Sequence, residues 1–235
     1  MTMIVGYHFS DGAVLIADSR ATWESPTRRK NIYQDTLQKI LPFGPKLVIG
    51  FAGDVQAALA VAAAIQKRVQ AKRELQHIAV LGPKFGRYAK HEFKTFAGAK
   101  RSRQGISLIL AGVDASPAAG GKPNEVQLWA YESPHFHPIR VENDFVVRGS
   151  AIPTVQPFLQ SNQLELNSQA GGLKGKADWL ISRLEGELER SGDLYVGGLF
   201  QVLLIDRETI RPMSYGRYSL DPDDEDDPVR MEIAS

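Results

Sequence analysis

The residues best suited to chemistry lie at the start of the chain, in the stretch M-T-M-I-V-G-Y-H-F-S-D-G-A-V-L-I-A-D. Removal of the initiator Met, which a small following residue favours, would make Thr2 the first residue. Its hydroxyl would then share a residue with a free α-amine. Such an amine has a pKa of about 7.7–8.0, so much of it is near the neutral form that can accept the hydroxyl proton. A hydroxyl activated in this way is a nucleophile for acyl transfer.

Other residue types that often carry chemistry form no comparable group. The sequence has no Cys, which excludes thiolate nucleophiles, thiolate metal sites and disulfides. No G-x-S-x-G, H-E-x-x-H or G-x-x-x-x-G-K motif occurs in it. His135 and His137 have the spacing of two metal ligands on a strand, but without a further ligand set a solvent-facing pair is the favoured interpretation. No metal or cofactor is therefore expected.

The composition limits the class of protein. With 235 residues and 43% hydrophobic content, the chain can build a sizeable core. A formal net charge of +1 argues against obligate binding of nucleic acid, since no global field would gather phosphates. The first residues lack a signal-peptide pattern, and no apolar run approaches the roughly 20 residues that cross a bilayer. We therefore expect a cytoplasmic protein without a membrane partner.

A β-hairpin is predicted to hold the start of the chain. Asp11-Gly12 lies between a β-prone run that begins at Ile4 and a second run over residues 13–17, which is the strongest short-range hairpin signal. The second strand would end at Asp18. A polar stretch, residues 23–36, follows and is interpreted as a surface loop.

Alternating strand and helix patterns continue along the chain. Further strands are expected at residues 37–43, 46–52, 106–113, 125–131, 136–142, 145–148 and 199–205. Helical spacing of apolar residues predicts helices at residues 55–70, 74–96, 153–161 and 174–191. Asp54 is a good N-cap for the first helix, and Gly82-Pro83 is expected to interrupt the second.

These elements predict an α+β fold with four layers. Two antiparallel sheets that face each other, covered outside by helices, would bury all the apolar stripes in an αββα sandwich. No internal repeat or domain boundary is evident, so residues 1–235 are expected to form a single domain. Within it, residues 221–235 would be a mobile acidic tail, because D-P-D-D-E-D-D lacks apolar residues that could hold it.

Several segments resemble those of proteasome β subunits and of the related bacterial HslV peptidase. They are, in chain order, T-M-I-V-G, D-G-A-V-L-I-A-D-S-R-A-T, Q-K-I, I-G-F-A-G-D before the first helix, E-N-D-F-V-V-R-G-S-A and G-D-L-Y-V-G-G. They occur in the order and spacing of that family from Thr2 to about Ile205. The resemblance implies the fold of the N-terminal nucleophile hydrolases and a threonine-type endopeptidase.

The resemblance also implies a catalytic group centred on Thr2 as the nucleophile. Lys39 would lie beside the Thr2 Oγ, where its positive charge would favour a neutral amine and a more acidic hydroxyl. Asp18 would pair with Lys39 and hold its ammonium in place.

Three further residues of the family pattern would complete the catalytic group. The backbone N–H of Gly53 would point at the developing oxyanion. Ser150 and Asp193 would form hydrogen bonds around the terminal amine and orient it. Val196 stands where the proteasomal pattern has a Ser that helps to hold the amine, so one hydrogen bond is expected to be missing.

Substrate would bind beside this group. By the same resemblance, Ala21 and Thr22, next to Arg20, would align an extended peptide by strand addition. Phe51 matches the position that forms the floor of the family's main specificity pocket. A large ring there predicts a preference for small or medium apolar side chains.

The resemblance implies a homo-oligomer of stacked rings of six or seven subunits, acting on unfolded polypeptide. An ATP-dependent unfoldase would be a further partner, although no feature of the sequence identifies one. Two alternatives stay open at this point: a small-molecule amidase of the same N-terminal nucleophile class, and an inactive ring subunit that retains Met1.

Overall fold

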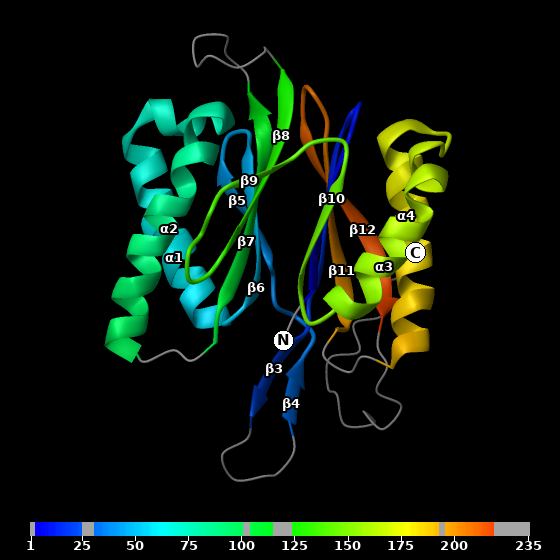
Figure 1. Cartoon of the computed structure of the whole chain (residues 1–235), viewed down its shortest axis with the longest axis horizontal. Coiled ribbons are helices and arrows are strands. Elements are labelled where there is room, and N and C mark those ends of the chain that lie inside the picture. Colours follow the sequence, from blue (N-terminus) through cyan, green and yellow to red (C-terminus); the bar gives the residue numbers. More distant parts are fainter. Residues whose placement is uncertain (1–2, 25–30, 101–103, 115–123, 193–195, 219–235) are drawn as a thin grey trace.

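The computed structural model describes residues 3–24, 31–100, 104–114, 124–192 and 196–218. In this part of the chain, two five-stranded antiparallel sheets face each other and a two-stranded sheet extends beyond them (Figure 1). Helices α1 and α2 cover the outer side of one sheet, and α3 and α4 cover the other (Figure 1). No helix among the described residues is long and apolar enough to cross a membrane.

The first sheet, in the order β10-β1-β2-β11-β12, contains the predicted hairpin. Its strands are β1 (Met3–Phe9), β2 (Gly12–Asp18), β10 (Phe145–Gly149), β11 (Gly198–Ile205) and β12 (Ile210–Tyr218). Every residue of β2 is buried, as expected for a central strand with a covered surface on both faces. Helices α3 (Ile152–Asn167) and α4 (Gly172–Ser191) lie on its outer face.

The second sheet, in the order β5-β6-β7-β8-β9, lies between the first sheet and the other helix pair. Its strands are β5 (Ile40–Gly44), β6 (Leu47–Gly53), β7 (Ile106–Asp114), β8 (Glu125–Glu132) and β9 (Ile139–Val141). Its outer face carries α1 (Val55–Ala71), the short 3₁₀ helix η1 (Arg73–Gln76) and α2 (Ile78–Lys100). As predicted, Asp54 caps α1: its Oδ1 accepts a hydrogen bond from the Ala57 N–H at 3.0 Å.

Three apolar clusters separate the four layers, one under each helix pair and one between the sheets. In the central cluster the two sheets approach closely at Gly50 of β6. A Cβ at this position would lie 2.0 Å from the Cδ1 of Ile4 on β1. Glycine there lets the sheets close over a well-filled interior. The predicted αββα sandwich is confirmed.

The predicted loop over residues 23–36 is wrong in part. Strands β3 (Ala21–Glu24) and β4 (Asn31–Gln34) pair there in antiparallel register. The sequence is polar because this two-stranded sheet extends beyond the sandwich (Figure 1), so no alternating apolar pattern is required of it. Residues 25–30 lie outside the described part of the chain.

The predicted interruption of the second helix is also wrong, because α2 runs through Pro83. Proline removes one helical hydrogen bond. Burial of Leu81 and Phe85 on either side of it compensates for this loss. Gly82 allows the helix to lie close to the sheet, since a Cβ there would be 2.4 Å from Nε1 of Trp129.

Smaller differences concern element lengths. The predicted strand over residues 136–142 is limited to β9, because Phe136 has a φ of +54° and belongs to the preceding turn. Helix α3 continues well past its predicted end at residue 161. Strand β12 was not predicted. The acidic tail at residues 221–235 lies outside the described residues, and the single-domain organisation stays a prediction.

Candidate active site

A buried ion pair joins the end of β2 to the segment just before β5. The Nζ of Lys39 donates a hydrogen bond to Oδ1 of Asp18 at 2.7 Å, and both side chains are 0% exposed. Lys39 Nζ also donates to the backbone oxygen of Arg20 at 2.5 Å. Two residues 21 positions apart in the sequence are therefore held together with no access to bulk water, as the resemblance implied.

Backbone groups from three segments complete the environment of Asp18. Its Oδ1 accepts from the Met3 N–H at 2.7 Å, and its Oδ2 accepts from the N–H groups of Arg20 at 3.2 Å and Gly197 at 3.3 Å. A buried carboxylate requires such donors, because an unsatisfied charge in the interior is costly. Asp18 is thus the point at which the start of the chain, the β2–β3 link and the residues before β11 meet.

Burial shifts the pKa of both members of the pair toward their neutral forms. Desolvation raises the pKa of Asp18 and lowers the pKa of Lys39. The attraction between the two charges opposes each shift. The site therefore contains an ammonium that gives up its proton more readily than a lysine in water.

The start of β1 lies beside the end of β10. Met3 pairs with Gly149 in the first sheet, and Ser150 follows directly after that pair. The Oγ of Ser150 is buried and has no hydrogen-bond partner within the described structure. A buried hydroxyl without a partner is unusual, so a polar group is expected to meet it. Thr2, which precedes Met3, and Asp193 lie outside the described residues, so their predicted roles stay predictions.

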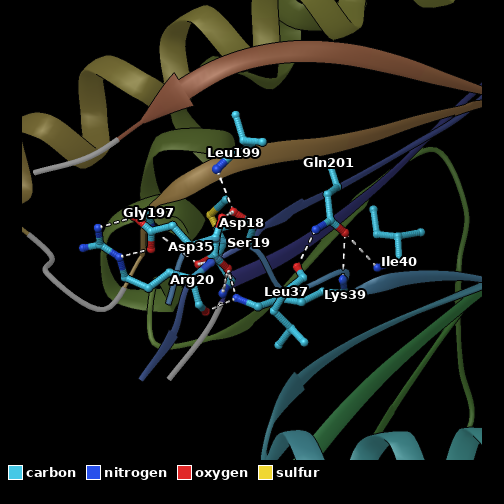
Figure 2. Close-up of polar contacts among 11 residues, drawn as sticks. Asp18, Ser19, Arg20, Asp35, Leu37, Lys39, Ile40, Gly197, Leu199 and Gln201 are labelled. Atoms are coloured by element: carbon cyan, nitrogen blue, oxygen red, sulfur yellow. Dashed lines mark hydrogen bonds and ion pairs between the residues drawn. The ribbon is translucent and has the colours of Figure 1, made fainter. Parts of the chain in front are cut away.

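A second ion pair supports the segment that carries Lys39 (Figure 2). The guanidinium of Arg20, 0% exposed, donates from Nε to Oδ1 of Asp35 at 2.7 Å and from Nη2 to Oδ2 at 2.8 Å. Ser19 Oγ donates to the Asp35 carbonyl at 2.6 Å and accepts from the Leu199 N–H at 2.7 Å. The Arg20 side chain is thus engaged with Asp35, and its predicted role in substrate binding stays a prediction.

Gly53 ends β6 where the chain turns into α1. Its φ is +98°, and a Cβ would lie 2.2 Å from the carbonyl oxygen of Gly105. Only glycine fits this backbone conformation and this close approach. The position of Gly53 in the fold therefore has a structural explanation, and its predicted contact with an oxyanion stays a prediction.

The first half of the chain matches a known protein family. Residues 2–119 match the family of proteasome subunits. The chain belongs to the proteasome subunit family. Among solved structures, the Anbu (Gly-1) mutant from Hyphomicrobium sp. strain MC1 has the same fold, with a TM-score of 0.66 and 19% identity over 94% of this chain and 88% of that chain. No curated protein shows significant sequence similarity to the chain.

The other predicted substrate residues of this proteasome-family subunit lie on β3 and β6. Ala21 and Thr22 begin β3, and the Thr22 Oγ1 is buried without a hydrogen-bond partner in the described structure. Phe51, 0% exposed, lies in β6 two residues before Gly53, and its ring belongs to the apolar cluster under α1 and α2. The roles of these three residues in binding stay predictions.

Val196 is fully buried in the apolar cluster under α3 and α4. Its side chain is thus part of the core at the position where the proteasomal pattern has a Ser. The next residue, Gly197, still serves the site through its backbone, because its carbonyl accepts the Arg20 N–H at 3.0 Å and its N–H donates to Asp18.

A hollow among the described residues lies elsewhere. It measures about 740 Å³ and is lined by the β1–β2 turn and the start of β8. Arg140, which lines it, is already paired with Glu125 and Glu142 at 2.9 and 2.8 Å. These charged groups at the hollow are therefore paired with one another, and none of the predicted catalytic residues lines it.

No group of three or more His, Asp or Glu side chains within the described residues is placed to hold a metal ion. His135 and His137 are exposed, and their rings stack with centroids 5.6 Å apart.

Sequence reasoning missed Asp35, Ser19 and Gln201, whose side chains support the backbone around Lys39. One signal for Gln201 was available, since it is the single polar residue in the run L-F-Q-V-L-L-I of β11.

Proposed function

We propose that this proteasome-family subunit is an N-terminal threonine endopeptidase. The observation that carries the proposal is the buried Lys39–Asp18 pair, whose carboxylate also accepts the N–H of Met3, the neighbour of Thr2. An ammonium held at this place is suited to act on the Thr2 hydroxyl and amine, because a nearby positive charge favours the ionised hydroxyl and the neutral amine.

In the proposed reaction, removal of Met1 frees the α-amine of Thr2. The amine, directly or through a water molecule, takes the proton of Thr2 Oγ as this oxygen attacks a peptide carbonyl, and the Gly53 N–H donates to the resulting oxyanion. Collapse of the intermediate breaks the C–N bond, and the α-ammonium returns its proton to the leaving amine. Water then attacks the ester on Thr2 with the amine again as base, which releases the acid and restores the hydroxyl.

The groups around the amine decide how well it is oriented. Ser150, whose buried Oγ lacks a partner in the described structure, would accept or donate a hydrogen bond there, together with Asp193. Val196 supplies no such bond, so turnover is expected to be slower than with a Ser at this position.

Substrate would enter as an extended chain. The backbone of Ala21 and Thr22, following Arg20, would pair with it by strand addition. Phe51 would restrict the specificity pocket to small or medium apolar side chains. A peptide library cleaved mainly after Arg or Asp would reject this preference.

The family also suggests how access to the site is controlled. Subunits would assemble into stacked rings of six or seven copies in the cytoplasm, and the sites would face an inner chamber. Unfolded polypeptide would be the substrate, because a closed ring excludes folded proteins. An ATP-dependent unfoldase would then deliver it.

One observation favours a second candidate, an inactive ring subunit. The apolar Val196 removes a hydrogen bond from the amine, and a retained Met1 would leave the Thr2 nitrogen acylated and unable to act as base. A small-molecule amidase of the same class would use the same chemistry on a different substrate.

The decisive experiment combines intact-mass measurement with three variants. A mass lower by one Met supports the enzyme, and hydrolysis of unfolded casein rather than of small amides supports the endopeptidase. Thr2→Ala should abolish hydrolysis without disturbing assembly, Thr2→Ser should retain part of it, and Thr95→Ala, on the exposed surface of α2, should behave as wild type. Persistent turnover in Thr2→Ala would reject the proposed nucleophile.

A further inference from the structure

A single glutamine side chain links the first sheet to the segment that carries Lys39. Gln201 lies on β11, and its Oε1 accepts hydrogen bonds from the N–H groups of Lys39 at 2.7 Å and Ile40 at 3.1 Å. Its Nε2 donates to the carbonyl oxygen of Leu37 at 2.5 Å. Figure 2 shows this amide directed at the backbone on either side of Lys39.

The segment needs such support because its backbone is irregular. Residues 37–39 precede β5 and belong to no strand, so no ladder of a sheet fixes all their peptide groups. The Leu37 N–H donates to the Ser19 carbonyl at 3.0 Å, and the Lys39 carbonyl accepts the Phe51 N–H at 3.1 Å. Gln201 satisfies three more polar groups, namely the Leu37 carbonyl and the Lys39 and Ile40 N–H groups.

The arrangement holds Lys39 at both of its ends. Asp18 and the Arg20 carbonyl fix the ammonium, while Gln201 fixes the peptide group from which the side chain begins. An apolar side chain at this position, like its neighbours in β11, would leave two N–H groups and one carbonyl of a partly buried segment unpaired. An apolar residue would be enough to pack this position of the sheet, so packing does not explain why it carries an amide.

We infer that Gln201 is a positioning residue, which places the Lys39 ammonium for catalysis by clamping the backbone of residues 37–40 to the first sheet. The catalytic half of this inference rests on the proposed function, whereas the clamp itself does not. A shift of about 1 Å in a catalytic group can lower turnover by about a hundredfold, so a clamp of this kind bears directly on rate.

The test replaces Gln201 with Met, which keeps the length of the side chain and removes all three hydrogen bonds. Gln127→Met is the matched control, because Gln127 is a buried glutamine of β8 that also forms side-chain hydrogen bonds, with Glu125 and Trp129. Gln201→Glu keeps the two accepted bonds and replaces the one to Leu37 with a repulsive contact between oxygens, so it is a second variant that disturbs the Leu37 end of the clamp.

Two measurements are made on each assembled protein. The first is amide hydrogen exchange of a peptide covering residues 37–41, which reports the clamp without any need for activity. The second is the separate determination of kcat and KM with a fluorogenic peptide that ends in a small apolar residue. Gln201→Met is expected to raise exchange in this peptide and to lower kcat about ten- to hundredfold, with KM changed less than about twofold. The control should leave both as in wild type.

The outcomes separate this inference from the proposed function. Wild-type exchange in the 37–41 peptide of Gln201→Met, or a kcat equal to that of wild type, would overturn the positioning role. If the wild-type protein hydrolyses nothing, the proposed function fails and the positioning role for catalysis fails with it, while the exchange measurement still decides whether Gln201 clamps the segment. An equal loss of activity in Gln201→Met and in the control Gln127→Met would show a general effect on packing and would also overturn the positioning role.

Discussion

At the scale of single residues, the central feature of the site is the buried pair of Lys39 and Asp18. An ion pair removed from water contributes little to stability by itself, because the loss of hydration offsets the attraction between the charges. Leaving one member buried without the other is far less favourable. The pair therefore fixes position rather than adding stability, which suits a group that must present a charge at one place.

Replacing Lys39 with Met should destabilise the protein in a pH-dependent manner. Loss of the ammonium leaves Asp18 as an uncompensated buried charge, and we expect a decrease of about 3–5 kcal/mol in the free energy of unfolding at neutral pH. Burial already raises the pKa of Asp18 in the folded state, and removal of Lys39 raises it further. An Asp18 carboxyl with a raised pKa in the folded state is protonated in both states in acid, where it does not destabilise the fold. As pH rises above the pKa of the unfolded state, ionisation favours the unfolded chain, so stability falls. The destabilisation measured by urea denaturation should thus be smallest in acid and grow toward neutral pH.

The control for this prediction is the double variant Asp18→Asn/Lys39→Met, in which neither group carries a charge. Its free energy of unfolding should exceed that of the Lys39→Met variant at neutral pH. It should also lack the loss of stability that accompanies ionisation of Asp18. If the Lys39→Met variant showed no such loss of stability as pH rises, Asp18 would not be charged in the folded protein.

At the scale of elements, the connection between β6 and α1 is tightly constrained. Gly53 adopts a positive φ against the Gly105 carbonyl, and Asp54 caps the helix that follows. The orientation of the Gly53 peptide is thus determined by a strand on one side and a capped helix on the other. A fixed backbone N–H is what an oxyanion donor requires.

Gly53→Ala should disrupt this joint. The new Cβ would meet the Gly105 carbonyl oxygen at 2.2 Å in a backbone region that alanine disfavours, so we expect a loss of about 1–3 kcal/mol in stability. Gly186→Ala in α4 is the matched control, because a Cβ there has no atom within 4 Å. It should raise stability by about 0.5–1 kcal/mol. Thermal unfolding distinguishes the two, and equal shifts would argue against strain at Gly53.

At the scale of the whole molecule, the two sheets must close on each other for Asp18, at the end of β2, to meet Lys39, just before β5. Their separation is set at positions such as Gly50, where the second sheet lies against Ile4 of the first. The close-packed interior transmits a change at this point to the distance between the sheets. Gly50 pairs with Ile40, next to Lys39, and Ile4 pairs with Ala17, next to Asp18, so the geometry of the site depends on this contact between the sheets.

Gly50→Ala should force Ile4 from its place, since the added Cβ would be 2.0 Å from Ile4 Cδ1. We expect overpacking to lower stability by about 1–3 kcal/mol. The double variant Gly50→Ala/Ile4→Val removes the atom in conflict and should recover part of this loss. Denaturant unfolding of the two single variants and the double variant measures the coupling, and simple additivity would contradict the proposed contact.

Much of the molecule follows from its sequence alone, because the signals are local. Asp11-Gly12 between two β-prone runs predicts the first hairpin, and Asp54 before an Ala-rich stripe predicts α1, since turn and cap preferences depend on near neighbours. The pairing of Lys39 with Asp18 was anticipated from a resemblance of motifs rather than from any local signal.

Only the tertiary structure decided the features that depend on contacts between distant segments. Helix α2 continues through Pro83 because burial against the second sheet outweighs one lost hydrogen bond. Gln201 meets Lys39 across 162 positions of sequence, a distance over which no periodicity or turn signal operates. The folding of two sheets onto each other brings these groups within hydrogen-bonding reach, and local propensity contains no information on that approach.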